Sequence, residues 1–421
     1  MDRSNLISRA EEISEAARFL ADKLAKHNQP EPTFEHGLPP ALRSDLEEAD
    51  TAAMSMCLKL TCLLDEFRDL LTEPSKHLSP ETRNPSLSIF PIVRLKIHDH
   101  VPEEGISVPD LAKKIKMDEN IVRRLMSHAA TYHVFFQSRP DYFIHTASSQ
   151  LLAENEGMQN WCLFGLGETM PAAFRIPELL LENGYSEEPK DSAWSFNNST
   201  DLPVFSAVAN TPERAAIFSK AMAWHNRLPG FSPKYLIDHF PFNDGETTVV
   251  DIGGGIGHIS QALASHNPSV KCIVQDLPEY VAQGKQMLPT ELESRVRFQA
   301  HDFFQEQPVK DADIYLLRHV LHDWSNTYAR KILKALIPAL KPGAKIILND
   351  RVIPGFGEAH YLLERESRDY DLYMFTLTNA QERTRLDWDH LFRDTDPRFK
   401  LMHVYKPEGS ILHILEVTWE G

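Results

Sequence analysis

The stretch that decides the fold is Val249-Val250-Asp251-Ile252-Gly253-Gly254-Gly255-Ile256-Gly257-His258, which predicts a strand, a glycine-rich turn and the start of a helix. Glycine lets a ligand approach the backbone closely, and the first turn of a helix presents unpaired N–H groups. The spacing is GxGxG rather than the GxGxxG of a nicotinamide site, and Asp251 stands directly before the turn. A carboxylate there repels a pyrophosphate but attracts the ammonium of an amino-acid moiety. A tight turn without a ligand remains the alternative.

Outward from this turn, short apolar runs alternate with helical stretches. The runs are residues 247–251, 271–275, 296–300, 314–317 and 345–348. Such alternation predicts an α/β, Rossmann-like fold, with a parallel sheet between two layers of helices. Residues 401–405 and 411–419 flank a Pro-Glu-Gly turn, and they predict a terminal hairpin at the sheet edge.

Two more acids stand where successive parallel strands should end, Asp276 and Asp302. Ligands of such sheets lie at the carboxyl ends of the strands, so these acids should converge with Asp251 on one crevice. Asp276 suits the two hydroxyls of a ribose, while Asp302 and Phe303 suit the amine and the flat face of an adenine. Each acid alone could equally be a helix cap.

The N-terminal third has a different pattern. Residues 6–25 and 45–71 predict helices on either side of the Pro-rich stretch 30–40. A short helix from residue 106, a second helix capped by Asp118 and a hairpin over 134–146 then follow in the order of a winged helix. We expect a helical, winged-helix domain over 1–150 and a catalytic domain over 151–421.

Charge argues against nucleic acid as the partner of this winged helix. Its second helix sets Asp118 and Glu119 against Arg123 and Arg124, and the chain carries a net charge of −16. A structural or dimerising role is therefore favoured over DNA binding.

Other sequence features limit the kinds of chemistry and the cellular compartment that are expected. The four cysteines show no metal-ligand spacing, and no signal peptide or membrane-spanning run is evident, which favours a cytoplasmic protein that binds no membrane. The run His98-Asp99-His100 resembles a ligand set for a metal-dependent transferase, but we interpret it as a surface loop and expect no metal.

The catalytic candidate follows the fourth run of the sheet, in Tyr315-Leu316-Leu317-Arg318-His319-Val320-Leu321-His322-Asp323-Trp324. A phenol with a pKa near 10 must lose its proton as its oxygen attacks an electrophilic methyl group, and a histidine is suited to remove that proton. We favour His322 over His319, although a purely structural histidine remains an alternative. Asp350 and Glu382 are candidates to orient it, unless Glu382 and Arg383 form only a solvated charge pair.

The motifs VVDIGGGIGHIS, VQDLP, HDFF, LRHVLHDWS, LKPGAKIILND and QERT together resemble the caffeic-acid-type O-methyltransferases of plants and fungi, over nearly the whole chain. The resemblance implies S-adenosylmethionine as the cofactor and His322 as the base, flanked by Asp350 and Glu382. The residues implied to hold the cofactor are Asp251, Gly253, Gly255, Asp276, Leu277, Asp302, Phe303 and Arg318, with Trp324 against its adenine. Arg318 and Asp350 depart from the usual Lys and Glu of the plant enzymes.

The resemblance also implies a homodimer and a small hydroxylated acceptor of secondary metabolism, bound between the domains. Helices near 158–174 and 215–226 should line its pocket. The candidate lining residues are Trp161, Phe164, Met170, Phe218, Met222 and Asp323, although such an aromatic and Met stripe is also typical of plain core. A cyclase or pericyclase that binds the cofactor without transferring its methyl group is the alternative function.

Overall fold

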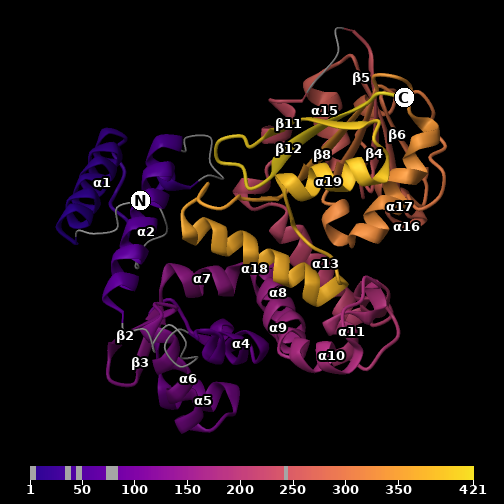
Figure 1. Ribbon diagram of the computed structural model, residues 1–421. Coiled ribbons are helices and arrows are strands. Elements are labelled where there is room, and N and C mark those ends of the chain that lie inside the picture. The colour runs from indigo at the N-terminus through magenta and orange to yellow at the C-terminus, as the bar shows by residue number, and fades with distance from the viewer. Residues whose placement is uncertain (1–5, 34–38, 44–49, 73–83, 241–244) are drawn as a thin grey trace. The chain divides into compact units, whose positions relative to one another are not determined.

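The computed structural model describes residues 6–33, 39–43, 50–72, 84–240 and 245–421 (Figure 1). The chain forms two compact units, one of Met1–Pro171 with Val208–Pro229 and one of Ala172–Ala207 with Gly230–Gly421. The domain boundary expected after residue 150 stays a prediction. In the structure, residues 151–171 belong to the first compact unit. No described helix combines the length and the apolar character needed to cross a membrane.

The first unit is mainly helical. Its elements are α1 (Leu6–Lys26), η1 (Pro40–Leu42), α2 (Thr51–Leu71), α4 (Ser86–Arg94), η2 (Ile97–His100), β1 (Ile106–Ser107), α5 (Val108–Ile115), α6 (Glu119–Thr131), β2 (Phe135–Arg139), β3 (Tyr142–His145), α7 (Ala147–Glu154), α8 (Glu156–Phe164), η3 (Gly165–Thr169) and α13 (Pro212–His225), with α9 (Met170–Ala173) and α12 (Val204–Ala209) at its borders. The predicted helix 45–71 is found from Thr51, and its first residues, 45–49, lie outside the described part of the chain.

The winged helix is confirmed. Strands β1, β3 and β2 form a small antiparallel sheet in that order beside α5 and α6. Asp118 caps α6 as predicted, because its carboxylate accepts hydrogen bonds from the N–H groups of Asn120 and Ile121. Arg123 is paired with Glu119 at 2.6 Å and with Asp141 at 2.8 Å, so much of the basic charge of this helix is neutralised.

The interpretation of His98-Asp99-His100 as a surface loop was wrong for its first residue. His98 lies in η2 with 1% of its surface exposed. Its Nδ1 lies 3.2 Å from the carbonyl oxygen of Ile92. Packing of η2 against α4 buries this ring, which sequence periodicity could not show in so short a segment.

The second unit is the predicted α/β fold. Its sheet strands are β4 (Thr247–Ile252), β5 (Val270–Asp276), β6 (Val296–Ala300), β7 (Ile314–Arg318), β8 (Lys345–Asp350), β11 (Phe399–Tyr405) and β12 (His413–Trp419). Its other elements are α10 (Ile176–Asn183), η4 (Pro189–Asp191), α11 (Ala193–Asn197), η5 (Pro229–Phe231), α14 (Pro233–Ile237), α15 (His258–His266), α16 (Pro278–Met287), η6 (Thr290–Leu292), η7 (Leu321–Asp323), α17 (Asn326–Leu336), η8 (Ile337–Ala339), β9 (Val352–Ile353), α18 (Tyr361–Thr378), β10 (Arg383–Thr384) and α19 (Arg385–Thr395).

Alternation along the strands builds a core on each face of the sheet. In β4, Val249 packs with α14, α15 and α16 on one face, whereas Val250 packs with α17 and α19 on the other. The strand order is β11-β12-β8-β7-β4-β5-β6, in which the five strands from β8 to β6 are parallel. The terminal hairpin is added at the other edge, as predicted, and pairs antiparallel with β8.

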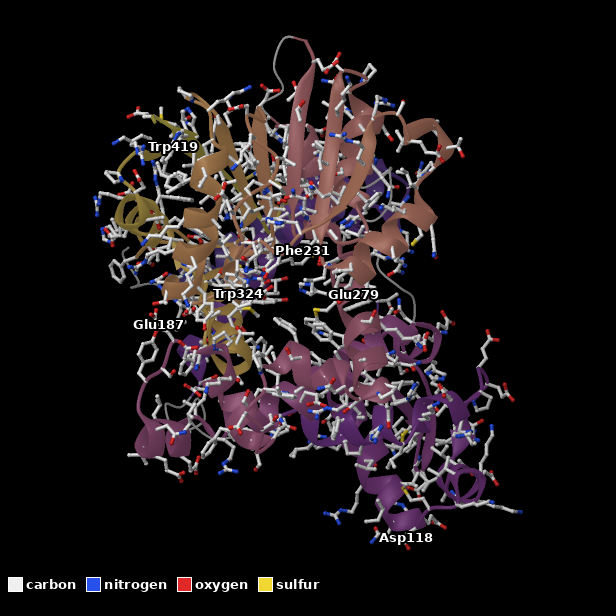
Figure 2. The ribbon with its side chains drawn as sticks, turned by 90° about the vertical axis from the view of Figure 1, so that its right-hand side faces the viewer. Asp118, Glu187, Phe231, Glu279, Trp324 and Trp419 are labelled. Carbon is white, nitrogen blue, oxygen red and sulfur yellow. The ribbon has the colours of Figure 1, made fainter. Side chains whose placement is uncertain are left out.

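This order reverses at β4, because β5 and β6 extend the sheet on one side of it and β7 and β8 on the other. The carboxyl ends of β4 and β7 therefore face the crevice where ligands of such sheets bind. Figure 2 shows Trp324 and Phe231 near this end of the sheet and Trp419 toward the opposite end.

Candidate functional site

The glycine-rich turn after β4 is shaped for close approach of a ligand. Gly253, Gly255 and Gly257 have φ angles of 70°, 57° and 82°, in the left-handed region that favours glycine. A Cβ on Gly253 would lie 2.8 Å from Cγ2 of Val320, whereas a Cβ on Gly255 would meet no atom within 4 Å. The turn is thus packed at Gly253 and open over Gly255.

Asp276, the last residue of β5, ties this turn to the neighbouring strand. Its Oδ2 accepts a hydrogen bond from the N–H of Gly255 at 2.8 Å, and its Oδ1 accepts one from the N–H of Leu277 at 2.7 Å. Burial raises the pKa of this carboxyl, and the two N–H donors partly oppose the rise. Because each carboxylate oxygen accepts more than one hydrogen bond, both remain able to bind the hydroxyls of a ribose.

Asp251 lies beneath the turn. Its carboxylate is 1% exposed and accepts a hydrogen bond from Oγ of Ser260 at 2.7 Å. Burial raises its pKa to about 6, against the effects of Ser260 and Arg318. A Cβ on Gly254 would lie 2.7 Å from its Oδ2, so the glycine leaves room for this acid. Asp251 thus supports the turn, and its contact with an ammonium group stays a prediction.

The structure brings together the aromatic side chains predicted to bind adenine. The rings of Phe303 and Trp324 lie edge to face with centroids 5.9 Å apart, and Trp324 stacks on Tyr328 at 5.7 Å. Asp302 accepts a hydrogen bond from the N–H of Phe304 at 3.0 Å, so it also fixes the local turn.

Arg318, at the end of β7, is a half-buried cation that interacts with two acids of the site. It donates to the carbonyl of Phe231 at 2.6 Å and to the side-chain oxygen of Asn349. Burial lowers its pKa to about 10, while Asp350 and Asp251 oppose this shift. The guanidinium therefore stays charged at neutral pH and balances both carboxylates.

His322 lies in η7, directly after β7, and pairs with Glu382. Its Nδ1 is 3.0 Å from Oε1 of Glu382, and its Nε2 is 3.6 Å from Oδ1 of Asp323. Burial lowers the pKa of His322, but Asp323 and Glu382 outweigh this effect and raise it to about 10. The base-and-orienter geometry predicted for His322 and Glu382 is therefore present, with an imidazole more basic than one that titrates near neutrality.

Asp350 is close to His322 without orienting it by a hydrogen bond. It is fully buried, and within the described residues neither of its oxygens has a hydrogen-bond partner. Burial raises its pKa to about 7, opposed by the charge of His322. Ligand atoms of His319, His322 and Asp350 all lie within 4.8 Å of one another, so these three could also reach a common cation. The shorter side chain of Asp350 leaves the direct contact with His322 to Glu382.

Arg383 is a positioning residue that the sequence did not single out. It is fully buried and donates to the carbonyls of Leu321 and Trp324, each at 2.8 Å, and to Oδ1 of Asn326 at 3.0 Å. These acceptors flank His322 in the chain, so one guanidinium holds the turn that carries the base. The alternative of a solvated Glu382–Arg383 pair is excluded, because Glu382 is only 5% exposed.

We expect Arg383→Lys to lower kcat roughly tenfold, since a single ammonium cannot reproduce the forked contacts that fix the His322 turn. Steady-state kinetics would measure this loss, and thermal unfolding would show whether the variant is folded at the assay temperature. Arg393→Lys, on the exposed side of α19, is the matched control and should keep normal turnover. An unchanged kcat in Arg383→Lys would contradict the role of Arg383 in positioning the His322 turn.

The acceptor candidates are divided between the units. Trp161 stacks on His225 at 4.6 Å, and Phe164 meets Phe218 edge to face at 5.2 Å, all on the packed helices α8 and α13 of the first unit. Met170 and Met222 belong to the same unit and are partly buried, whereas Asp323 belongs to the second. Their contact with an acceptor stays a prediction.

Comparisons with known proteins identify the family of the chain. Residues 181–396 match the O-methyltransferase domain family, and residues 85–155 match the O-methyltransferase dimerisation domain. The grayanic acid biosynthesis cluster O-methyltransferase of Cladonia grayi is 36% identical over 97% of this chain and 88% of its own. The chlorophenol O-methyltransferase of Trichoderma longibrachiatum is 34% identical over 75% of this chain and 69% of its own.

A solved structure of LepI in complex with SAM has a TM-score of 0.71 and 20% sequence identity, covering 98% of this chain and 100% of that one. This likeness shows a shared fold. The family match and the relatives, together with the glycine turn and the His322 site, establish that the chain belongs to the S-adenosylmethionine-dependent O-methyltransferases.

Proposed function

We propose that this enzyme methylates a phenolic hydroxyl of a small aromatic secondary metabolite, with His322 as the general base. The observation that carries this proposal is the 3.0 Å contact between Nδ1 of His322 and Oε1 of Glu382. If Nδ1 carries the hydrogen of that bond, Nε2 of the neutral imidazole is the free base. The named activity of the chlorophenol relative supports a phenol as the acceptor class.

The bound cofactor supplies a methyl group activated by its positively charged sulfur. Nε2 of His322 would take the hydroxyl proton as the acceptor oxygen receives the methyl group, with the demethylated cofactor as the leaving group. Glu382 stabilises the resulting imidazolium through Nδ1, and Arg383 keeps the turn in place. For the cofactor, Asp276 would bind the ribose hydroxyls, Phe303 and Trp324 would contact the adenine, and the open backbone at Gly255 would admit the donor.

The experiment that tests this function is incubation of the purified chain with methyl-labelled S-adenosylmethionine and a panel of phenols, polyketides and indoles. Mass spectrometry should find label on the oxygen of a phenol and none on the matched analogue that lacks the hydroxyl. Label on carbon or nitrogen, or no transfer to any phenol, would contradict the proposal.

The pH dependence of turnover should report the raised pKa of His322. Because its pKa is about 10, the imidazole is protonated at neutral pH and turnover should rise as the pH is raised from 7 toward 9. Glu382→Gln removes a negative neighbour of the imidazolium, which lowers the pKa, so the midpoint of the rise should move to lower pH by about one unit or more. Profiles of kcat against pH, measured with the same acceptor for the unaltered chain and for Glu382→Gln, test this shift. The same midpoint in both proteins would contradict an effect of Glu382 on the pKa of His322.

A cyclase or pericyclase reaction without methyl transfer remains the second candidate, supported only by the fold shared with a solved structure described as a pericyclic reaction enzyme. A pericyclic rearrangement needs no group to deprotonate a phenol, so the paired His322 and Glu382 favour methyl transfer. We further propose that the chain acts as a homodimer through its dimerisation domain and is located in the cytoplasm.

A further inference from the structure

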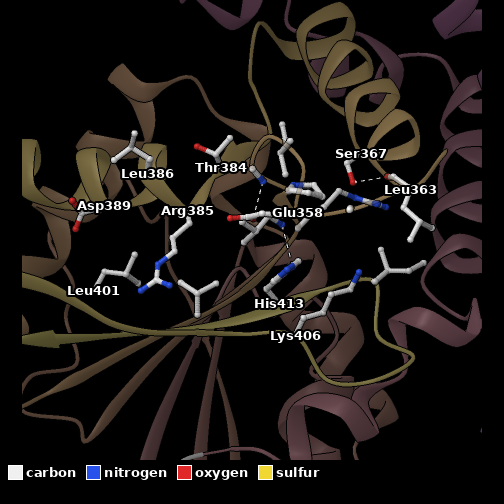
Figure 3. Close-up of a pocket in the computed structure, with 18 residues that line it drawn as sticks. Glu358, Leu363, Ser367, Thr384, Arg385, Leu386, Asp389, Leu401, Lys406 and His413 are labelled. Atoms are coloured by element: carbon white, nitrogen blue, oxygen red, sulfur yellow. Dashed lines mark hydrogen bonds between the residues drawn. The ribbon is translucent and has the colours of Figure 1, made fainter. Parts of the chain in front are cut away.

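A pocket of about 920 Å³ lies within the second unit, and neither the glycine turn nor His322 lines it (Figure 3). Its walls are β9, the start of α19, the first turns of α18 and the β11–β12 hairpin. No candidate catalytic or cofactor residue lines it. Its volume lies within the range of pockets that hold small organic ligands.

The pocket shares a wall with the catalytic site. Asp350 ends β8 beside His322, and the next residue, Arg351, lines the pocket. Glu382 likewise precedes the short strand β10, whose Thr384 lines the pocket. The parallel pair β9–β10 therefore connects residues of the pocket to residues that adjoin His322 and its partner Glu382.

Much of the pocket surface is apolar. Its aliphatic lining residues include Val352, Ile353, Leu363, Leu401, Val404 and Ile411. Such a surface favours a ligand with a hydrocarbon or aromatic body.

One end of the pocket gathers three basic groups, Arg351, Lys406 and His413. Arg351 is 3.6 Å from Glu366 and lies 4.0 Å over the ring of Tyr370, and Nδ1 of His413 accepts a hydrogen bond from a backbone N–H. Figure 3 shows Lys406 beside His413, with both side chains pointing into this end. Burial and the charge of Arg351 lower the pKa of Lys406, and burial with both cations lowers that of His413 to about 4. An anion placed there would relieve this repulsion.

The two acids that line the pocket, Glu358 and Asp389, contact groups other than Arg351 and Lys406. Glu358 accepts a hydrogen bond from the N–H of Gly355 at 2.8 Å, and Asp389 lies 3.5 Å from Arg393 on α19. Lys406 and Arg385, in contrast, form no ion pair or hydrogen bond with another residue of the described chain.

We propose that this pocket binds an amphipathic organic anion. The anionic head, a carboxylate, lies against Lys406 and Arg351, and the apolar body lies along Val352, Leu401 and Val404. The ligand is bound beside the β9–β10 wall and is separate from the methyl acceptor.

Isothermal calorimetry with decanoate, on the full chain saturated with S-adenosylhomocysteine, tests this site. Decanoate should bind at one site and 1-decanol at least tenfold more weakly. Lys406→Gln should weaken decanoate binding about tenfold, because it removes the charge that faces the head group. Lys400→Gln, an exposed cation of β11 outside the pocket, is the matched control and should bind normally.

Val404→Trp offers an independent test, since the larger ring fills the pocket and should abolish decanoate binding while methyl transfer continues. Absence of decanoate binding to the unaltered chain, equal affinity for the acid and the alcohol, or an unchanged affinity in Lys406→Gln would each overturn the proposal. Methyl transfer is measured separately for every variant, so failure of this site and failure of the proposed function give different results.

Discussion

Replacing His322 with alanine should lower kcat by about 10²-fold or more, the usual scale for removing a positioned base. Affinity for S-adenosylmethionine should change little, because the imidazole pairs with Glu382 and Asp323 rather than with the glycine turn. Label transfer to a phenol measures the loss, and calorimetry with S-adenosylhomocysteine measures cofactor binding.

His319→Ala is the control for this experiment, since the two imidazole centroids lie only 5.1 Å apart. The His319 variant should retain most of its turnover. Normal turnover in His322→Ala, or an equal loss in both variants, would refute the choice of His322 as the base.

Asp276→Ala should weaken cofactor binding by about 10²-fold. The substitution removes two hydrogen bonds that hold the turn, and it also removes the two carboxylate oxygens that would accept hydrogen bonds from the ribose hydroxyls. Each of these hydrogen bonds is worth about 1 kcal/mol. The structure strengthens this expectation, since Asp276 also fixes the N–H of Gly255. Calorimetry with S-adenosylhomocysteine measures the change.

Glu279→Ala is the matched control for Asp276, since it removes a nearby carboxylate that is exposed on α16. This variant loses one negative charge near the site but none of the hydrogen bonds of Asp276, and it should bind the cofactor normally. Wild-type affinity in the Asp276 variant would count against its proposed role.

Most of the architecture could be predicted because its signals are local. The five parallel strands lie within two residues of the predicted runs at each end, since buried strands between helices leave short β-branched segments in the sequence. The hairpin at the sheet edge followed from its turn chemistry. The prediction that His98 lies in a surface loop was wrong, because the burial of this side chain comes from packing between elements.

The sequence alone indicated the donor and predicted the base. The glycine spacing, the acid near the end of successive strands and the His322 motif are patterns of residue type, and the chemistry constrains those types directly. Only the tertiary structure decided how these groups are held. Arg383 supports the His322 turn from more than fifty residues away in the chain, and Asp350 is buried without a hydrogen bond to His322. Lys406 and Arg351 likewise share one pocket because a hairpin and a strand meet there. Such distances and burial arise from long-range packing, which the spacing of residues in one sequence does not reveal.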